Sequence, residues 1–405
     1  MAHSSQRKPA TAVLTTEYIE TAMNPLKNSS ISAVQIEKVE GQRALKEFIS
    51  LPRALYKEDP VWVPPLLIER RMHLSPKNPY FEHASYCSWI AYRDGQAVGR
   101  ISAQMDELHL DRYQDATGFF GMLEAEDHST TFKALLGTAE TWLRDRGMKR
   151  VWGPFNLSIN QEIGMLVEGF ETSPSLMMGH ARPYYGLRME ESGYQKVKDV
   201  LAYLIDAHFE PSPAMKTITN RARGRVRTRP LRKSHFKKEL EIIYDIYNDA
   251  WSQNWGFIPF TRKEFDHMGS DLKLLVNEEL VRIAYVDSEP AAFMAVLPNL
   301  NEIIRDLNGR LLPFGWLKML WRLKVNYPQT ARIPLMGVRR RYQDSLLGAA
   351  LAYTLIRDVI RPGLKRGIKK VELSWILEDN TRMRNIIENI SGRVYKTYRI
   401  YTKDL

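Results

Sequence analysis

The clearest pattern along the chain is an apolar run that passes into a helical repeat. Residues 333–338 read IPLMGV, which has the length and composition of a buried strand. Beyond a polar turn, apolar residues recur with helical spacing at Leu346, Leu347, Ala350, Leu351 and Leu355. The sequence therefore predicts a strand that enters a helix through a short turn.

The first half of the chain alternates between short apolar runs and amphipathic stretches. Two apolar runs flank Asp94-Gly95, and this strong turn signal predicts a hairpin. The other predicted elements here are strands at 33–39, 118–123 and 150–155 and helices at 41–57 and 132–146. The turn into the second helix carries Glu124, Glu126 and Asp127, and three carboxylates would repel an anionic ligand.

The second half predicts the same order of elements more clearly. Thr261, followed by Glu264 three residues later, has the spacing of a capping box at a helix start. The predicted helices are 240–251, 261–276, 346–366 and 380–390, and the strands are 280–286, 291–297, 333–338, 370–377 and 393–403. We therefore expect an α/β fold of two tandem domains, 34–205 and 206–405, each with a mixed, mostly antiparallel sheet flanked by helices, after a disordered tail at 1–33.

Charge and cysteine content narrow the class of protein. The chain has 58 Lys and Arg against 47 Asp and Glu, a net charge of +11, which suits an anionic partner. Cys87 is the single cysteine, so an intramolecular disulfide and a cysteine metal cluster are excluded. The first 30 residues lack the apolar segment of a secretory signal, and no apolar run reaches 18 residues. We expect a cytoplasmic protein.

The strand-to-helix turn is the strongest candidate for a ligand site. Backbone N–H groups at a helix start point outward, and together with the helix dipole they form a cradle for a pyrophosphate. The residues expected to contribute are Val338, Arg339, Arg340, Arg341, Tyr342, Gln343, Ser345, Leu347, Gly348 and Ala349.

These residues resemble the acyl-CoA motif of the GNAT superfamily of N-acyltransferases. That motif runs Gln/Arg-x-x-Gly-x-Gly/Ala after a strand; Gln343 and Gly348 fit it, and Leu346 stands where the middle glycine is usual. The resemblance implies acyl-CoA as co-substrate. It also implies that Asn380 touches the pantetheine arm, whereas Ile387 occupies the place of a tyrosine that often serves as the acid.

Three further segments, 60–65, 156–170 and 254–259, are similar to those of tandem GNAT proteins among which bacterial ceramide synthases are found. The resemblance implies transfer of a fatty acyl group from acyl-CoA to the amine of a sphingoid base. Two alternatives remain open. One is a GNAT enzyme acting on a soluble amine, and the other is a non-catalytic binding protein with a GNAT fold.

Acyl transfer to an amine needs a group that removes the amine proton. Glu162 and Glu378, which each lie near the end of a predicted strand, are the candidate general bases. The structural alternatives are a helix-capping carboxylate for Glu162 and an exposed turn carboxylate for Glu378. No metal is expected, because the nine histidines form no pair spaced for a metal site.

Two basic segments suggest further partners. In 311–324, Lys318 and Arg322 lie opposite Phe314, Leu317, Leu320 and Trp321 on a helix, the pattern of a peripheral membrane helix or of one that packs on its own domain. In 221–238, arginines alternate as on one face of an extended segment. They form a solvated face or contact an anionic lipid or the coenzyme. No aromatic residue stands between these arginines, so nucleic acid is not expected.

Overall fold

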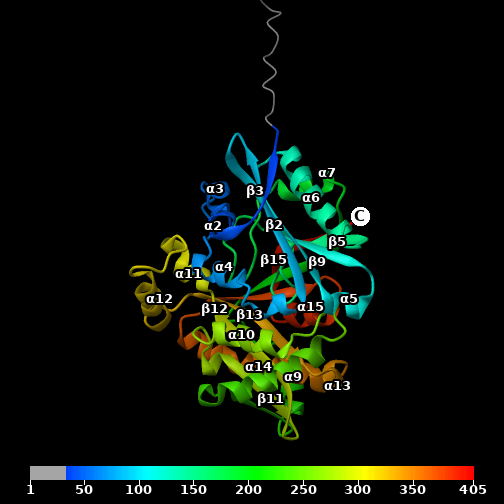
Figure 1. Cartoon of the computed structure of the whole chain (residues 1–405). Coiled ribbons are helices and arrows are strands. Elements are labelled where there is room, and N and C mark those ends of the chain that lie inside the picture. Colours follow the sequence, from blue (N-terminus) through cyan, green and yellow to red (C-terminus); the bar gives the residue numbers. More distant parts are fainter. Residues whose placement is uncertain (1–32) are drawn as a thin grey trace, which may run out of the picture. The chain divides into compact units, whose positions relative to one another are not determined.

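A computed structural model of the chain describes residues 33–405, and residues 34–405 form one compact unit. Apart from Ala33, the tail predicted at 1–33 lies outside this range. The described chain builds one mixed sheet with helices on both faces, which confirms the α/β class (Figure 1).

The sheet runs in the order β1-β2-β3-β4-β5-β15-β9-β14-β13-β12-β11-β10, with β8 also paired to β15. These strands are β1 (Gln35–Lys38), β2 (Ala84–Arg93), β3 (Gln96–Asp106), β4 (Thr117–Ala125), β5 (Arg150–Gly153), β8 (Met165–Glu168), β9 (Gln195–Asp206), β10 (Val226–Pro230), β11 (Val281–Val286), β12 (Glu289–Pro298), β13 (Thr330–Val338), β14 (Lys370–Leu377) and β15 (Arg393–Asp404); β6 (Phe155–Asn156) and β7 (Glu162–Ile163) form a separate pair. The α-helices are α2 (Gly41–Ser50), α3 (Pro52–Leu55), α4 (Leu67–His73), α5 (Glu107–Tyr113), α6 (Ser129–Arg144), α7 (Tyr185–Glu191), α8 (Pro213–Arg221), α9 (Phe236–Trp251), α10 (Arg262–Leu272), α11 (Leu300–Ile304), α12 (Gly315–Lys324), α13 (Arg340–Gln343), α14 (Leu346–Lys365) and α15 (Thr381–Glu388).

The two predicted local signals are confirmed. Asp94 and Gly95 take φ values of 50° and 73°, the left-handed backbone that a two-residue hairpin turn between β2 and β3 requires. Thr261 and Glu264 form the capping box at the start of α10, each side chain bonding the other residue's backbone N–H.

The sequence pattern did not predict how the two halves join. The last strand, β15, leaves its own half and pairs antiparallel with both β5 and β9. β9, which the pattern missed, also pairs with β14, so a single sheet runs through both halves. The domain division at 205/206 falls at the end of β9 and stays a prediction.

In the second half, helices cover both faces of the sheet. Neighbouring residues of a strand point to opposite faces. Phe293 of β12 packs in the apolar cluster that includes α9, and Met294 packs in the cluster that includes α14. Two separate cores therefore flank β11–β13. The turn after β13 leads to α14, which lies on the same face as Met294.

Candidate functional site

The site is built around a gap between two parallel strands. β13 and β14 pair only where Thr330–Ile333 lie beside Lys370–Leu373. Beyond this point β13 follows β12 and β14 follows β9, so the two strands separate. The carboxyl ends of parallel strands are where α/β sheets bind ligands.

The turn that follows β13 is tightly packed. Ser345 is the N-cap of α14, and its Oγ accepts a hydrogen bond from the Gly348 N–H at 3.2 Å. A Cβ at Gly348 would collide with the carbonyl oxygen of Tyr342. Gly348 is thus required for the turn to pack closely against the start of α14.

Some of the predicted site residues already bond other protein groups, and others remain available to a ligand. Arg339 donates to the Pro290 carbonyl at 2.8 Å, Arg341 pairs with Glu289 at 2.5 Å, and Gln343 donates to the Ala250 and Val338 carbonyls. The Arg340 guanidinium, by contrast, has no polar partner among residues 33–405.

The start of α14 also has unused donors. The backbone N–H groups of Leu346 and Leu347 have no acceptor in the described chain, and the Leu346 side chain is 70% exposed. Together with Arg340 they could receive an anion. Asn380 caps α15 by accepting from the Met383 N–H at 3.1 Å, and its predicted contact with pantetheine stays a prediction.

An apolar cavity of about 170 Å³ opens at the gap between β13 and β14. At the gap it is lined by Pro334, Leu335, Trp375 and Leu377. It continues over β12 and β11 past Ala295, Phe293 and Val281, and under α9 and α10 past Phe236, Leu240 and Gly269. Such a cavity suits a long aliphatic group.

Few polar groups line this cavity, and none of the described ones is a carboxylate. Tyr247 donates to Asn160 Oδ1 at 2.8 Å, which satisfies both side-chain oxygens. The Trp375 indole N–H is buried and has no partner within residues 33–405, so it is available to a bound molecule. Asn254 lies on the wall, as do Trp251 and Trp255.

A buried cation supports the base of the gap. Arg332 is fully buried, donates to Ser374 Oγ at 2.9 Å and to the Leu176 carbonyl at 2.7 Å, and lies 3.4 Å from Glu372. Its guanidinium also lies 4.6 Å from the centre of the Trp375 ring. Arg332 therefore fixes the position of Trp375 at the cavity.

The structure holds the two predicted bases in different surroundings. Glu162 forms a two-pronged ion pair with Arg70 and accepts from Asn156 Nδ2 at 2.9 Å. Burial alone would raise the pKa of Glu162, but the Arg70 charge outweighs it and lowers the pKa to about 2. A carboxyl group with such a pKa is a weak base at neutral pH.

Glu378 directly follows Leu377, a cavity-lining residue at the end of β14. Its Oε2 lies 2.6 Å from Lys196 Nζ, and its Oε1 accepts from the Asp199 N–H at 3.1 Å. Its side chain is 33% exposed, so water can reach it. No contact joins Glu378 to Glu162.

The corresponding gap in the first half is filled. β4 and β5 pair only at Thr117–Phe119, but β6 then packs against β4: Asn156 Oδ1 accepts from the Met122 N–H at 2.7 Å. A Cβ at Gly121 would collide with the carbonyl oxygen of Phe155. The backbone of β6 therefore occupies the space that the second half leaves to its cavity.

The carboxylates of the acidic turn in the first half are already engaged by protein donors. Tyr56 and Tyr185 donate to Glu124 at 2.7 and 2.8 Å. Arg93 donates to Glu126 at 3.0 Å, and Arg188 pairs with Asp127 at 2.8 Å. The turn thus has carboxylates where the second half has arginines.

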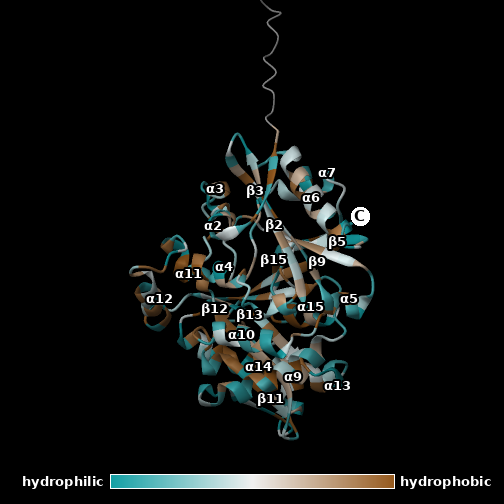
Figure 2. Cartoon of the chain, viewed as in Figure 1, coloured by the Kyte–Doolittle hydropathy of each residue, from teal (hydrophilic) through white to brown (hydrophobic). Residues whose placement is uncertain are grey.

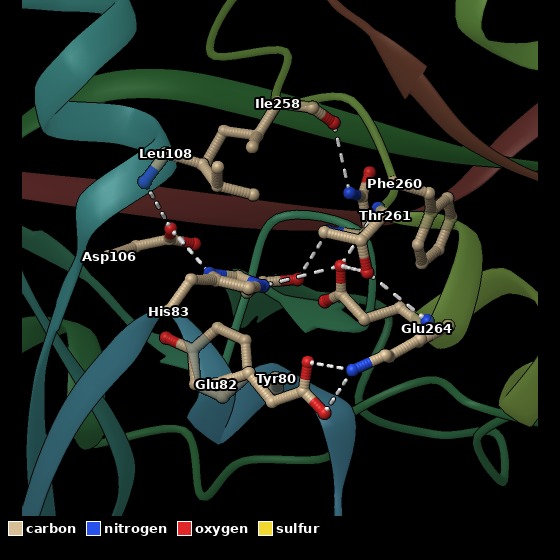
Figure 3. A network of polar contacts seen from close by, with 12 residues as sticks. Tyr80, Glu82, His83, Asp106, Leu108, Ile258, Phe260, Thr261 and Glu264 are labelled. Atoms are coloured by element: carbon tan, nitrogen blue, oxygen red, sulfur yellow. Dashed lines mark hydrogen bonds and ion pairs between the residues drawn. The ribbon is translucent and has the colours of Figure 1, made fainter.

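A histidine links the first half to the helix that covers the cavity (Figure 3). His83 donates to Asp106 at 3.0 Å and lies 3.3 Å from Glu264 in the capping box of α10. Burial alone would lower the pKa of His83, but its interactions with Asp106 and Glu264 raise it to about 10. The imidazole is therefore protonated at neutral pH and joins two carboxylates.

The structure of the basic segment 221–238 differs from the predicted extended segment. In 221–238, only β10 is a strand; Arg221 ends α8, and Arg229 pairs with the buried Glu239 at 2.6 Å. The prediction that all these arginines share one extended face is therefore wrong. Arg227 remains exposed on β10.

The helix predicted within 311–324 is α12, and it carries both hydrophobic and hydrophilic residues (Figure 2). Met319 and Leu323 pack on the chain, and Leu320 is half-buried. An apolar face stays exposed, made of Leu312, Phe314, Leu317, Trp321 and Val325. Lys318 and Arg322 are paired with Asp306. None of the helices in residues 33–405 has the length and apolar content needed to cross a bilayer.

Sequence reasoning missed the cavity walls. Phe236, Leu240, Ile243 and Tyr247 recur with helical spacing on α9, and such a stripe predicts a core face. A stripe that lines a cavity has the same pattern, so only the assembled structure separates the two.

Comparisons with known proteins place the chain in a family. No protein-family model matches the sequence. Protein YghO of Escherichia coli (strain K12) is 49% identical over 364 residues, 89% of this chain and 93% of that protein. The bacterial ceramide synthase of Caulobacter vibrioides (strain NA1000 / CB15N) is 43% identical over 381 residues, 93% of this chain and 98% of that protein.

Solved structures support the fold. The tandem GNAT protein from the clavulanic acid biosynthesis pathway (without AcCoA) is 12% identical with a TM-score of 0.52, covering 92% of this chain and 98% of that chain. The GCN5-related glucosamine N-acetyltransferase region of a fungal multi-domain GH3 β-N-acetylglucosaminidase has the same TM-score at 10% identity, covering 92% and 38%. The predicted tandem GNAT fold is confirmed. This chain therefore belongs to the family that includes Protein YghO and the bacterial ceramide synthase, and it has a tandem GNAT fold.

Proposed function

We propose that this protein transfers a fatty acyl group from acyl-CoA to the amine of a sphingoid-base-like lipid. The observation that carries the proposal is the apolar cavity that opens at the gap between β13 and β14, beside the basic turn before α14. The relation to the bacterial ceramide synthase supports the choice of substrates.

The pyrophosphate of the coenzyme binds at the start of α14 in this proposal. The N–H groups of Leu346 and Leu347 donate to it, and Arg340 supplies a positive charge. The pantetheine arm then enters the gap between the strands, which brings the thioester to Trp375. The carboxylates and the β6 backbone in the first half leave no such place.

The reaction needs few protein groups. The free amine attacks the thioester carbonyl carbon, a C–N bond forms, the C–S bond breaks, and the thiolate leaves and is protonated by water. The Trp375 N–H donates to the carbonyl oxygen as negative charge develops there. Glu378, through water, takes the amine proton; Arg70 holds the pKa of Glu162, the other predicted base, at about 2.

A membrane contact would supply the lipid acceptor. The exposed apolar face of α12 includes Phe314 at 72% and Trp321 at 55% exposure. Asp306 pairs with both Lys318 and Arg322 and offsets one of their two positive charges, so the apolar residues, the remaining charge and Lys324 provide the attraction to an anionic bilayer. We propose that this face lies in the membrane interface.

Incubation of the purified protein with palmitoyl-CoA and a sphingoid base, followed by mass spectrometry, tests the proposed function. We expect an N-acylated base and an equal amount of free CoA. A parallel incubation with amino sugars and amino acids tests the soluble-amine alternative. Acyl-CoA binding without product for any amine would favour a non-catalytic binding protein.

A further inference from the structure

We propose that the cavity holds the acyl chain of the donor and that its closed end, formed by Leu240 and Gly269, sets the chain length. This inference rests on the proposed function and adds the residues that select the donor. It concerns the part of the cavity that lies beyond the gap, under α9 and α10.

The cavity extends from the gap between β13 and β14 to Leu240 and Gly269. Pro334 and Leu335 line its mouth and lie on β13, the strand that leads into the turn before α14. A thioester held in the gap therefore has its acyl chain directed over β12 and β11. The chain of an acceptor, which approaches from outside the gap, has no equivalent connection to this turn.

The length of the cavity matches a long chain. Its lining crosses from β14 through β13 and β12 to β11. Three strand spacings amount to roughly 14 Å. An extended chain advances roughly 3.5 Å for every three single bonds, so this distance accommodates about twelve bonds.

Small residues keep the cavity open along this path. Ala295 lies on β12 between the mouth and the far end, and it contributes only a methyl group to the wall. At the far end, Gly269 allows α10 to approach α9, because a Cβ there would lie 2.6 Å from Leu240 Cδ1. Phe236 and Leu231 complete the end wall.

Two substitutions should shift the preferred chain length in opposite directions. Ala295→Leu shortens the cavity, and Leu240→Ala extends it. Each buried methylene changes affinity by about fourfold, so a shift of two or three methylenes changes the preference by about 15- to 60-fold. Circular dichroism and thermal melts first establish that both variants fold.

The experiment measures kcat/KM for acyl-CoA from C8 to C20 with one base, and then for bases of different length with one acyl-CoA. Melting temperatures with each acyl-CoA provide a second readout that needs no turnover. We expect the optimum of the donor series to fall for Ala295→Leu and to rise for Leu240→Ala, while the acceptor series is unchanged.

A shift confined to the acceptor series would overturn the proposal, because the cavity would then hold the chain of the base. Unchanged donor optima in two folded variants would overturn it as well. Failure of the proposed function looks different: the wild-type protein would produce no amide, although the melting temperatures would still depend on acyl-chain length.

Discussion

The two strand-to-helix turns, one in each half, have the same architecture and opposite chemistry. After β4 the gap is closed by β6, and the turn carries Glu124, Glu126 and Asp127, all engaged by protein donors. After β13 the gap opens into a cavity, and Arg340 and two backbone N–H groups remain available. The comparison shows that a fold can be present twice while the space and charge for a ligand are present once.

The largest effect is expected at Glu378, at the end of β14. Glu378→Gln removes the proposed base while keeping the size of the side chain. Loss of a general base costs about 10²–10⁴-fold in rate. Steady-state turnover between pH 6 and pH 9 checks this, with Glu162→Gln as the matched variant. Wild-type turnover in Glu378→Gln would remove the base assignment.

The second-largest effect is expected at His83, which links the two halves. Its pKa is about 10 in the folded chain and about 6.5 in an unfolded one. Protonated His83 thus stabilises the fold fully below pH 6.5, and this contribution disappears as the pH rises through 10. His83→Gln should cost about 3 kcal/mol, since it removes the cation that lies between two buried carboxylates.

Urea unfolding at pH 6.5 and pH 10 measures this difference. The gap between wild type and His83→Gln should be largest at pH 6.5 and should narrow at pH 10. An equal gap at both values would mean that His83 acts through packing and not through its charge.

The third-largest effect is expected when the turn before α14 is given a negative charge like that of the turn after β4. Leu346→Glu adds a carboxylate at an exposed helix start. There the carboxylate interacts favourably with the helix dipole but repels a pyrophosphate. Two charges near a protein surface interact by up to about 4 kcal/mol at 4 Å; half of that corresponds to about 30-fold weaker CoA binding. Leu346→Gln is the uncharged control.

Calorimetric titration with CoA measures the loss for both variants. Equal affinity of Leu346→Glu and wild type would place the pyrophosphate elsewhere. Gly348→Glu is a less informative variant, because any side chain there collides with Tyr342.

The local features of the structure were predictable from the sequence, and the long-range features were not. The Asp94-Gly95 hairpin and the Thr261 capping box depend on neighbours within a few residues. The Arg70–Glu162 ion pair joins residues 92 positions apart. Nothing in the local sequence around Glu162 indicates this partner, although the partner decides its pKa.

The same distinction explains the missed topology and cavity. The position of β15 between β5 and β9 depends on pairing with strands far away in the sequence. The apolar residues that line the cavity follow ordinary helix and strand periodicity. Whether they meet in a filled core or leave a cavity depends on the sizes of residues such as Ala295 and Gly269 on different elements.

The smallest effect is expected at α12, which belongs to the second half. Replacing Leu317 and Trp321 with glutamate should weaken binding to anionic liposomes about tenfold or more, because both side chains are about half exposed and lose apolar contact area. Co-sedimentation measures this, and CoA affinity is the control. A folded variant that still sediments would favour the basic segment at 221–238 as the membrane contact.

Hydrogen–deuterium exchange with and without a non-reactive thioether analogue of palmitoyl-CoA tests the central difference between the two turns most directly. At saturating analogue, we expect slower exchange of the amides in 340–350 and along the cavity wall of α9 and α10, and unchanged exchange in 124–131. Protection in 124–131, or none in 340–350 despite saturation, would contradict the assignment of the coenzyme to the second half.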